Sequence, residues 1–293
     1  MAATITPKSA LSGRKVPTRR MFFEESLAEL PKHFAGDGDL IGSHLAAVLS
    51  SVFPDGEDFF VRSVRNFRDQ IDDADLKRDV AGFIGQEAIH GREHRVLNNR
   101  LADLGYPTKR LERSTKFGLG MREKFISPMG NLAATAALEH FTATIAALLL
   151  SNEEARKKLG IPELRDLLLW HALEECEHKA VAFDVYKAVG GSEKTRRRQM
   201  NAITATFLGG ISFNVFTSLL RDRETYRRGN LRASIKRMKN SPMFTREVWR
   251  DLRDYNRVDF HPNDHDTDAL LDQWRDELFG DEGRLNHMLA GAA

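Results

Sequence analysis

Two short segments of the chain combine glutamate and histidine at the spacing of a helical metal site. In HALEECEHK, the residues His171, Glu175 and His178 are four and three positions apart, so on an α-helix they would share one narrow stripe. In GQEAIHGREH, Glu87 and His90 repeat the Glu-x-x-His spacing. One such pair is expected by chance about once in a chain of this length, whereas two pairs indicate a shared site.

Two further glutamates, Glu57 and Glu139, each precede one of these pairs in the sequence. Helices joined by a short turn pack antiparallel, so residues equidistant from the turn lie at the same level. The midpoint of Glu57 and Glu87 is residue 72, in the polar segment IDDAD, and the midpoint of Glu139 and Glu175 is residue 157, in the turn sequence KKLGIP. Each pair of glutamates is therefore expected to meet across a helical hairpin. The resulting order is the known order of di-iron and di-manganese carboxylate bundles.

The composition is that of a folded soluble protein. Hydrophobic residues make up 41% and charged residues 29% of the 293 residues, which is enough to bury a core. The formal net charge is only +2, so bulk charge does not indicate nucleic acid as a partner. A single cysteine, Cys176, allows no disulfide framework and is expected to be a buried filler. We expect a cytoplasmic protein, with membrane association as an additional possibility.

Hydrophobic periodicity predicts helices and no strands. Helices are expected from residue 40 up to an interruption at Pro54, over 54–70, over 76–104, over an apolar stretch from about 131 to 150, over 162–189, from 193 onward, and over Asp268–Phe279. Residues 107–128 are expected to form an irregular basic connection. The fold prediction is all-α, a ferritin-like four-helix bundle with additional N- and C-terminal helices. Residues 1–22 would form a flexible basic arm, and residues 23–293 a single helical di-metal domain with its bundle core at about 40–190.

The stretch Ala202–Leu220 carries no charge and is flanked by arginines at 196–198 and 221–228. Its Thr, Ser, Gly and Asn content makes it weakly hydrophobic, which favours a covering helix in the core or an oligomer interface, as in a homodimer, over a membrane contact. A peripheral membrane contact through residues 196–228 remains the alternative.

Several segments carry a family resemblance that covers most of residues 40–275. The stretches FPDGE, FIGQEAIHGREHRVLN, ALEHF, HALEECEHKAVAFDVY and FHPNDHD resemble the bacterial family labelled predicted metal-dependent hydrolases. That resemblance implies a ferritin-like bundle. The placement of His171 four residues before Glu175 is similar to the arylamine N-oxygenases, di-iron enzymes in which an additional histidine at that spacing binds iron. This second similarity implies oxygen activation.

The favoured functional hypothesis is a non-haem di-iron oxidase or oxygenase. It would bind two metal ions per chain, preferably Fe with Mn or a mixed Fe/Mn pair as alternatives, and use O2 as co-substrate to oxidise a small organic substrate. An external electron donor would restore the reduced metal pair. The first alternative is a di-metal-dependent hydrolase, as the family label says. The second is a non-catalytic metal-binding or membrane-associated helical protein.

The candidate residues fall into three groups. The expected metal ligands, which would also be the catalytic groups, are Glu57, Glu87, His90, Glu139, Glu175 and His178. His171 is either a seventh ligand or a hydrogen-bond donor to a ligand, and the candidates for orienting ligands are His94, Glu174 and Asp184. Asp184 could instead pair with an arginine. His140 is expected to face away from the stripe of Glu139, and His261 and His265 either close the site or cap a turn.

Overall fold

The computed structural model describes residues 16–290, and within them the chain forms helices and no strand, apart from one isolated bridge between Met21 and Leu289. The all-α prediction is therefore confirmed. The α-helices are α1 (Leu40–Arg65), α2 (Ala74–Asp103), α3 (Thr108–Phe125), α4 (Pro128–Ser151), α5 (Glu153–Lys157), α6 (Pro162–His178), α7 (Val181–Ala188), α8 (Glu193–Leu219), α9 (Asn230–Lys239), α10 (Arg246–Asp254) and α11 (Asp268–Phe279).

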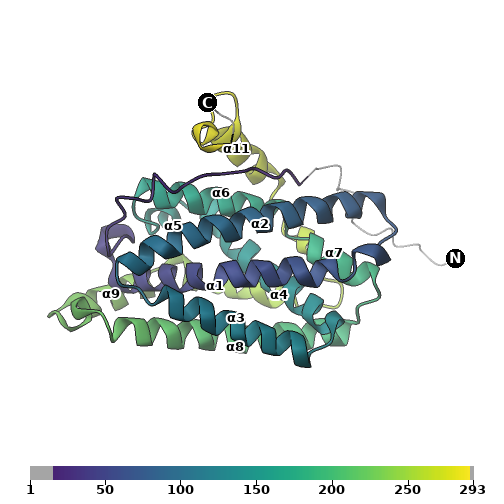
Figure 1. The fold of residues 1–293 in the computed structure, drawn as a ribbon, viewed down its shortest axis with the longest axis horizontal. Helices are drawn as coiled ribbons and strands as arrows, with labels where there is room; N and C mark the ends of the chain where they lie inside the picture. Colours follow the sequence, from purple (N-terminus) through teal and green to yellow (C-terminus); the bar gives the residue numbers. More distant parts are fainter. Residues whose placement is uncertain (1–15, 291–293) are drawn as a thin grey trace.

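Two helical hairpins form the centre of the molecule. Helix α1 packs along α2, and α4 packs along α6 and α7, as the positions of the glutamates predict. Contacts between α1 and α4 and between α2 and α6 join the two hairpins (Figure 1). Helices α3 and α8 run along one edge of this centre, and α11 lies against α6 on the opposite side. The ferritin-like character of this arrangement stays a prediction.

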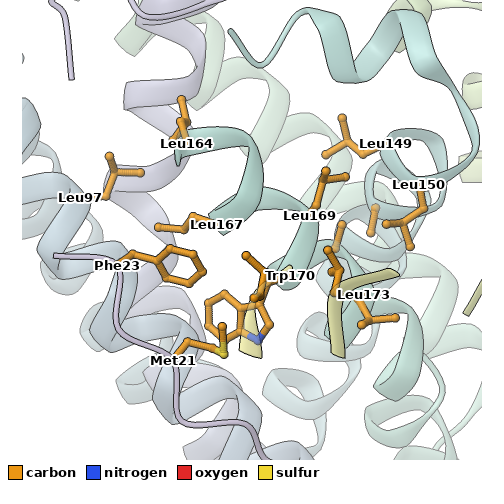
Figure 2. Close-up of a cluster of buried hydrophobic side chains, with 14 of the residues drawn as sticks. Met21, Phe23, Leu97, Leu149, Leu150, Leu164, Leu167, Leu169, Trp170 and Leu173 are labelled. Carbon is orange, nitrogen blue, oxygen red and sulfur yellow. The ribbon is translucent and has the colours of Figure 1, made fainter. Parts of the chain in front are cut away.

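The N-terminal segment covers α6 and helps to build the main hydrophobic core. Met21 and Phe23 are fully buried, and the ring of Phe23 lies 5.6 Å from that of the fully buried Trp170 (Figure 2). Leucines from α2, α4 and α6 complete the cluster. Of the expected flexible arm, residues 1–15 lie outside the described residues, whereas residues 16–22 pack against the bundle. The prediction of a flexible arm is therefore wrong for residues 16–22.

Pro54 does not end a helix, contrary to the prediction. It lies inside α1, where its missing N–H would leave the carbonyl of Ser50 without a helical partner. The side-chain amide of Asn98 on α2 donates to that carbonyl at 3.0 Å. A side chain 44 residues further along the chain thus replaces the lost backbone hydrogen bond, so Glu57 sits within a long helix and not at a helix start.

Two other expectations about the helices are wrong. Residues 107–128 contain α3, whose Leu111 packs with Val48 of α1 and Ile211 of α8. The expected helix 162–189 is divided at residues 179 and 180 into α6 and α7. The C-terminal part contains α9 and α10 in addition to the predicted Asp268–Phe279 helix, which is confirmed. Few residues of α3 and α9 are buried.

Two described helices are long and apolar enough to cross a membrane by length and composition alone, α4 and α8. They differ in burial. The most apolar window of α4 is 67% buried, as befits a core helix, while that of α8 is only 17% buried. As expected, α8 covers the core, because one face of it packs on α4 and α1 and buries Met200, Ile203 and Ile211. Most of its remaining uncharged surface faces outward.

Candidate metal centre

Seven side chains from the two hairpins converge at the centre of the bundle. The four glutamates Glu57, Glu87, Glu139 and Glu175 come from α1, α2, α4 and α6 respectively. Their exposed fractions are 5% or less, and His90 and His178 are fully buried beside them. The structure therefore brings together the glutamates and histidines that the sequence selects.

Many of the polar atoms in this cluster have no hydrogen-bond partner among the described residues. They are both carboxylate oxygens of Glu57, Glu87 and Glu139, Oε2 of Glu175, Nδ1 of His90 and Nε2 of His178. His178 Nε2 lies 3.1 Å from Glu87 Oε1 and 3.3 Å from Glu139 Oε2, but neither contact has hydrogen-bond geometry. Buried polar atoms are almost always satisfied, so this concentration of unpaired acceptors requires a compensating cation.

The hydrogen bonds around His178 determine which of its nitrogens carries the proton. Gln86 Nε2 donates to Pro17 O at 2.8 Å and to Glu177 Oε2 at 2.9 Å, so Gln86 Oε1 is an acceptor. That oxygen lies 2.8 Å from His178 Nδ1, which must therefore be protonated. In the neutral ring, Nε2 is then the unprotonated nitrogen, and it faces the carboxylates.

A chain of hydrogen bonds determines the tautomer of His171 in the same way. Asn98 Nδ2 donates to the carbonyl of Ser50 and to Glu112 Oε1, both at 3.0 Å, so its Oδ1 accepts from the Ser50 hydroxyl at 2.7 Å. Ser50 Oγ must then accept from His94 Nδ1 at 2.9 Å, which leaves His94 Nε2 as the acceptor for His171 Nδ1 at 2.7 Å.

This series of hydrogen bonds ends at His171 Nε2, which points into the cluster. Without a metal, a retained proton makes the hydrogen bond between this nitrogen and Glu175 Oε1, and a bound cation would replace that proton. This nitrogen lies 2.9 Å from Glu175 Oε1 and 3.9 Å from Glu57 Oε1. Both nitrogens of His94 take part in these hydrogen bonds. His94 therefore positions His171 and has no nitrogen left to bind a metal. His171 itself has the arrangement of a seventh ligand.

His90 is oriented by a buried ion pair with the N-terminal segment. Its Nε2 lies 2.9 Å from Glu174 Oε2, and the other oxygen of Glu174 accepts from Arg19 Nη1 at 2.9 Å. When Glu174 Oε2 accepts the Nε2 proton of the neutral His90 ring, Nδ1 is the unprotonated nitrogen, and it faces Glu175 Oε1 at 3.6 Å. Glu174 thus has the orienting position predicted from the sequence, and Arg19 neutralises it.

Burial and mutual repulsion perturb the pKa values of the cluster strongly. Burial, together with the neighbouring carboxylates, raises the pKa of Glu57 and of Glu87 well above the ordinary value. Burial also raises the pKa of Glu139 to about 7. For His178, burial alone would lower the pKa, but the carboxylates of Glu139 and Glu175 outweigh it and raise the pKa well above its ordinary value. Without a metal, the cluster therefore retains protons.

These pKa values predict how the stability of the metal-free protein depends on pH. Because the pKa of Glu139 is about 7 in the folded protein and near 4.5 when exposed, the folded state binds more protons between these values. The free energy of unfolding should fall as the pH rises from 5 to 7, by about 1.4 kcal/mol per pH unit for this group. Urea unfolding of chelator-treated protein across this range measures the slope. Burial lowers the pKa values of His44, His90, His94 and His140, which act in the opposite direction, so the contribution of Glu139 is the difference in slope between the wild type and Glu139→Gln. Equal slopes in the two proteins would contradict this account.

The residues present fit two divalent cations. Four carboxylates can neutralise the four positive charges of such a pair, and three imidazoles each direct a nitrogen into the same space. Groups of three ligand atoms that lie within 4.8 Å of one another occur repeatedly in the cluster, for example in Glu87, Glu175 and His178. Carboxylate and imidazole ligands suit iron, manganese and zinc.

Other candidate residues lie away from the cluster. Asp184 accepts from His261 Nε2 at 2.8 Å, so it neither orients a ligand histidine nor pairs with an arginine. His261 also caps the turn at Pro262–Asp264, and His140 donates to the carbonyl of Asp251 at 2.9 Å and faces away from the cluster. Cys176 is buried as expected.

Sequence reasoning did not identify Gln86, Ser50, Asn98, Arg19 and Glu177 as parts of the site. Each acts through contacts between residues distant in sequence. Only Gln86 carried a usable signal, since it is a polar residue next to Glu87 on a helix that must bury that face. The acid Glu177 accepts from Arg19, Arg275 and Gln86, so it is an ion-pair centre that supports the histidine side of the cluster.

A mostly apolar cavity of about 200 Å³ reaches the cluster from the surface. Its inner end is lined by His94, His171 and Glu175, and its outer end by residues of α5, α9 and the segment after α9. The remaining candidate ligands do not line it. A substrate could therefore approach the cluster through this cavity from the side of His171 and Glu175.

Comparison with known proteins assigns the chain to a family. No curated protein and no solved structure matches it. The family model described as "Predicted metal-dependent hydrolase" matches residues 17–266, which include all the residues of the buried cluster. The match extends over most of the chain, and the protein therefore belongs to the family of predicted metal-dependent hydrolases.

Proposed function

We propose that the protein is a metal-dependent enzyme whose buried cluster binds two divalent metal ions. The observation that carries this proposal is the set of three imidazole nitrogens that face four carboxylates in a buried site, where most of the carboxylate oxygens and two of the nitrogens have no hydrogen-bond partner. Without cations, such a site would be left with unsatisfied acceptors, at a cost of several kcal/mol.

The distances divide the cluster into two groups of ligands. Glu87, Glu139 and His178 would hold one ion. Glu57, His90 and His171 would hold the other. Glu175 Oε1 lies 2.9 Å from His171 Nε2, 3.6 Å from His90 Nδ1 and 3.7 Å from His178 Nε2, so Glu175 is within reach of both.

Metal-dependent hydrolysis is the reaction that the family description supports. Bound divalent ions supply an acidified water and polarise a carbonyl or phosphoryl oxygen. The chain's own residues would admit the substrate along the cavity to Glu175 and His171. The hydrogen-bond chain from Asn98 to His171 would hold the imidazole in one orientation, and Arg19 would fix Glu174 and, through it, His90.

Oxidation by O2 at a di-iron centre is the second candidate, and one observation favours it. The ligand set is a Glu, Glu-x-x-His, Glu, Glu-x-x-His arrangement from separate helices, which is typical of di-iron and di-manganese carboxylate proteins. Such a reaction would need an external electron donor, and manganese or a mixed pair could replace iron. The family description supports this candidate less well than hydrolysis.

One experiment separates the two reactions. Metal-free protein is loaded anaerobically with Fe(II), Mn(II) or Zn(II), its metal is counted, and p-nitrophenyl esters and phosphodiesters are supplied without oxygen. Steady hydrolysis that needs the metal supports the hydrolase. Fe(II)-dependent oxygen uptake with no hydrolysis by any metal form overturns hydrolysis in favour of oxidation. A chain that binds no metal overturns both candidates, and many irons per chain would indicate storage.

A further inference from the structure

The cavity that reaches the cluster has a polar outer end and an apolar body. Between the two ends it is lined by aliphatic side chains of α1, α2, α4 and α6, among them Leu45, Leu49 and Leu149. At the outer end lie Lys158 and Arg237, both partly exposed, and Phe244, which is 45% exposed. The inner end, at His94 and His171, is buried.

The charge of the outer end is positive. Arg237 Nη1 lies 3.5 Å from Asp39 Oδ1, and this pair is close to neutral. Lys158 adds a further positive charge, since no ion pair involving it occurs among residues 16–290. An anionic group would be attracted to this opening, whereas a cationic group would be repelled.

From these two features we infer that the cavity binds an anionic amphiphile, with its carboxylate or phosphate at Lys158 and its apolar chain along the aliphatic walls toward His171 and Glu175. This inference rests on the proposed function, because it makes such an amphiphile the substrate class of the metal centre. For hydrolysis, the ester of the substrate would lie in the inner part of its apolar chain, beside His171 and Glu175. Each methylene group buried along the walls should strengthen binding about fourfold.

Calorimetric titration of the metal-loaded full chain tests the inference with three ligands of equal chain length. Dodecanoate and dodecyl phosphate distinguish the two anionic groups, and dodecyltrimethylammonium carries the opposite charge. We expect at least one anion to bind about tenfold or more tightly than the cation. Equal or tighter binding of the cation, or no binding of either anion, overturns the inference.

Two variants locate the ligand. Lys158→Glu should weaken binding of the anion about tenfold, whereas Lys157→Glu, at the neighbouring exposed lysine outside the cavity lining, should leave it nearly unchanged. Ala46 lies half-buried on α1, and Ala46→Phe narrows the aliphatic part of the cavity. This substitution should shift the preferred acid from dodecanoate toward the shorter octanoate. An unshifted chain-length preference in a folded Ala46→Phe protein would place the ligand elsewhere.

Counting metal in the same samples distinguishes failure of this inference from failure of the proposed function. If the protein holds two metals but binds neither anion, only the inferred substrate class is wrong. If the protein binds dodecanoate but never holds a metal, the proposed function is wrong, although the cavity is still a binding site.

A separate feature, the outward face of α3 and α8, carries a second inference. The two helices are linked by hydrogen bonds from Arg110 to Thr217 at 3.4 Å and from Arg122 to Gln199 at 2.6 Å. Large apolar side chains stand exposed on both helices: Phe117 (70%), Met121 (40%), Phe125 (68%), Phe213 (64%), Phe216 (58%) and Leu220 (47%). Isolated exposed apolar residues are ordinary, but this number on two neighbouring helices is not.

The charge next to this face points to its occupant. Residues 221–239, which follow α8 directly, contain eight Lys or Arg and two acids, although the whole chain carries only +2. We propose that the α3–α8 face docks on an anionic lipid bilayer, with the phenylalanines entering the interface and the cations contacting the headgroups. Phe207 of α8 also lines the cavity, so the docked face would lie beside the path to the metal centre.

Vesicle co-sedimentation of the full chain tests this second inference. Binding to phosphatidylcholine vesicles with 30% phosphatidylglycerol should exceed binding to pure phosphatidylcholine by about tenfold. The double variant Phe213→Ser/Phe216→Ser should lose that binding. Val258→Ser, at a residue 71% exposed and outside this face, should keep it. Absence of binding to anionic vesicles overturns the inference. It is also overturned if ultracentrifugation shows that the wild type is a dimer and the double variant a monomer, because the face would then be a dimer interface.

Discussion

Replacement of Glu175 by glutamine is expected to lower metal affinity and metal-dependent activity at least about 100-fold, while leaving the fold intact. Glu175 is the one carboxylate near all three imidazole nitrogens that face the cluster. Loss of a residue that only orients a metal ligand typically costs 10–100-fold in affinity or activity, and loss of a shared ligand should cost more. Glutamine keeps the size of the side chain but removes the negative charge on which cation binding depends.

Metal counting after dialysis, together with titration of the metal-free variant, measures this effect. The control is Glu153→Gln, at a glutamate whose side chain is 71% exposed on α5 and far from the cluster in the sequence. A further comparison is Glu174→Gln, which should weaken metal binding by about tenfold because it affects only the orientation of His90. An unaltered metal content and affinity in Glu175→Gln would contradict the assignment of the cluster.

Replacement of Arg19 by methionine is expected to reduce the free energy of unfolding by about 3 kcal/mol, since it removes the cation that pairs with the buried Glu174 and one of the two arginines that pair with Glu177. Arg19 donates to Glu174 at 2.9 Å and to both oxygens of Glu177 at 2.9 Å, and the side chains of these acids are 1% exposed or less. Burial raises the pKa of Glu174 to about 8 even with Arg19 present.

Urea unfolding of the metal-free protein at pH 7 measures this loss. Arg20→Met, at the exposed neighbouring arginine, is the matched control and should change stability by less than about 0.5 kcal/mol. The double variant Arg19→Met/Glu174→Gln should recover part of the stability, because the buried carboxyl that loses its cation is then absent. Equal stabilities of Arg19→Met and the control would show that the N-terminal segment does not stabilise the site.

The residues of the cluster could be predicted from the sequence because they depend on the periodicity of the helices and on the equal distance of paired glutamates from the turn between them. His171, Glu175 and His178 share a stripe on any α-helix, and the turn positions bring Glu57 opposite Glu87 without further information. The burial of Glu139 in an apolar helix was equally visible, since an acid in such a sequence needs compensation. These inferences rely only on spacing within one hairpin.

The interactions that fix the imidazoles could not be predicted in this way. Gln86, Asn98 and Arg19 act on residues of other helices or across 155 positions of the chain, where spacing carries no signal. The continuation of α1 through Pro54 depends on the same Asn98 side chain. Asp184 lay at a plausible spacing from the ligands, but α7 directs it to His261 instead.

The central claim is that the buried Glu/His cluster holds two metal ions, and anomalous X-ray diffraction from crystals of the protein with its native metal tests it most directly. The account predicts two anomalous peaks about 3.5–4 Å apart, enclosed by Glu57, Glu87, Glu139 and Glu175. The absence of peaks in the cluster would contradict it, and so would a single peak at the separate group of His33, His44 and Asp222.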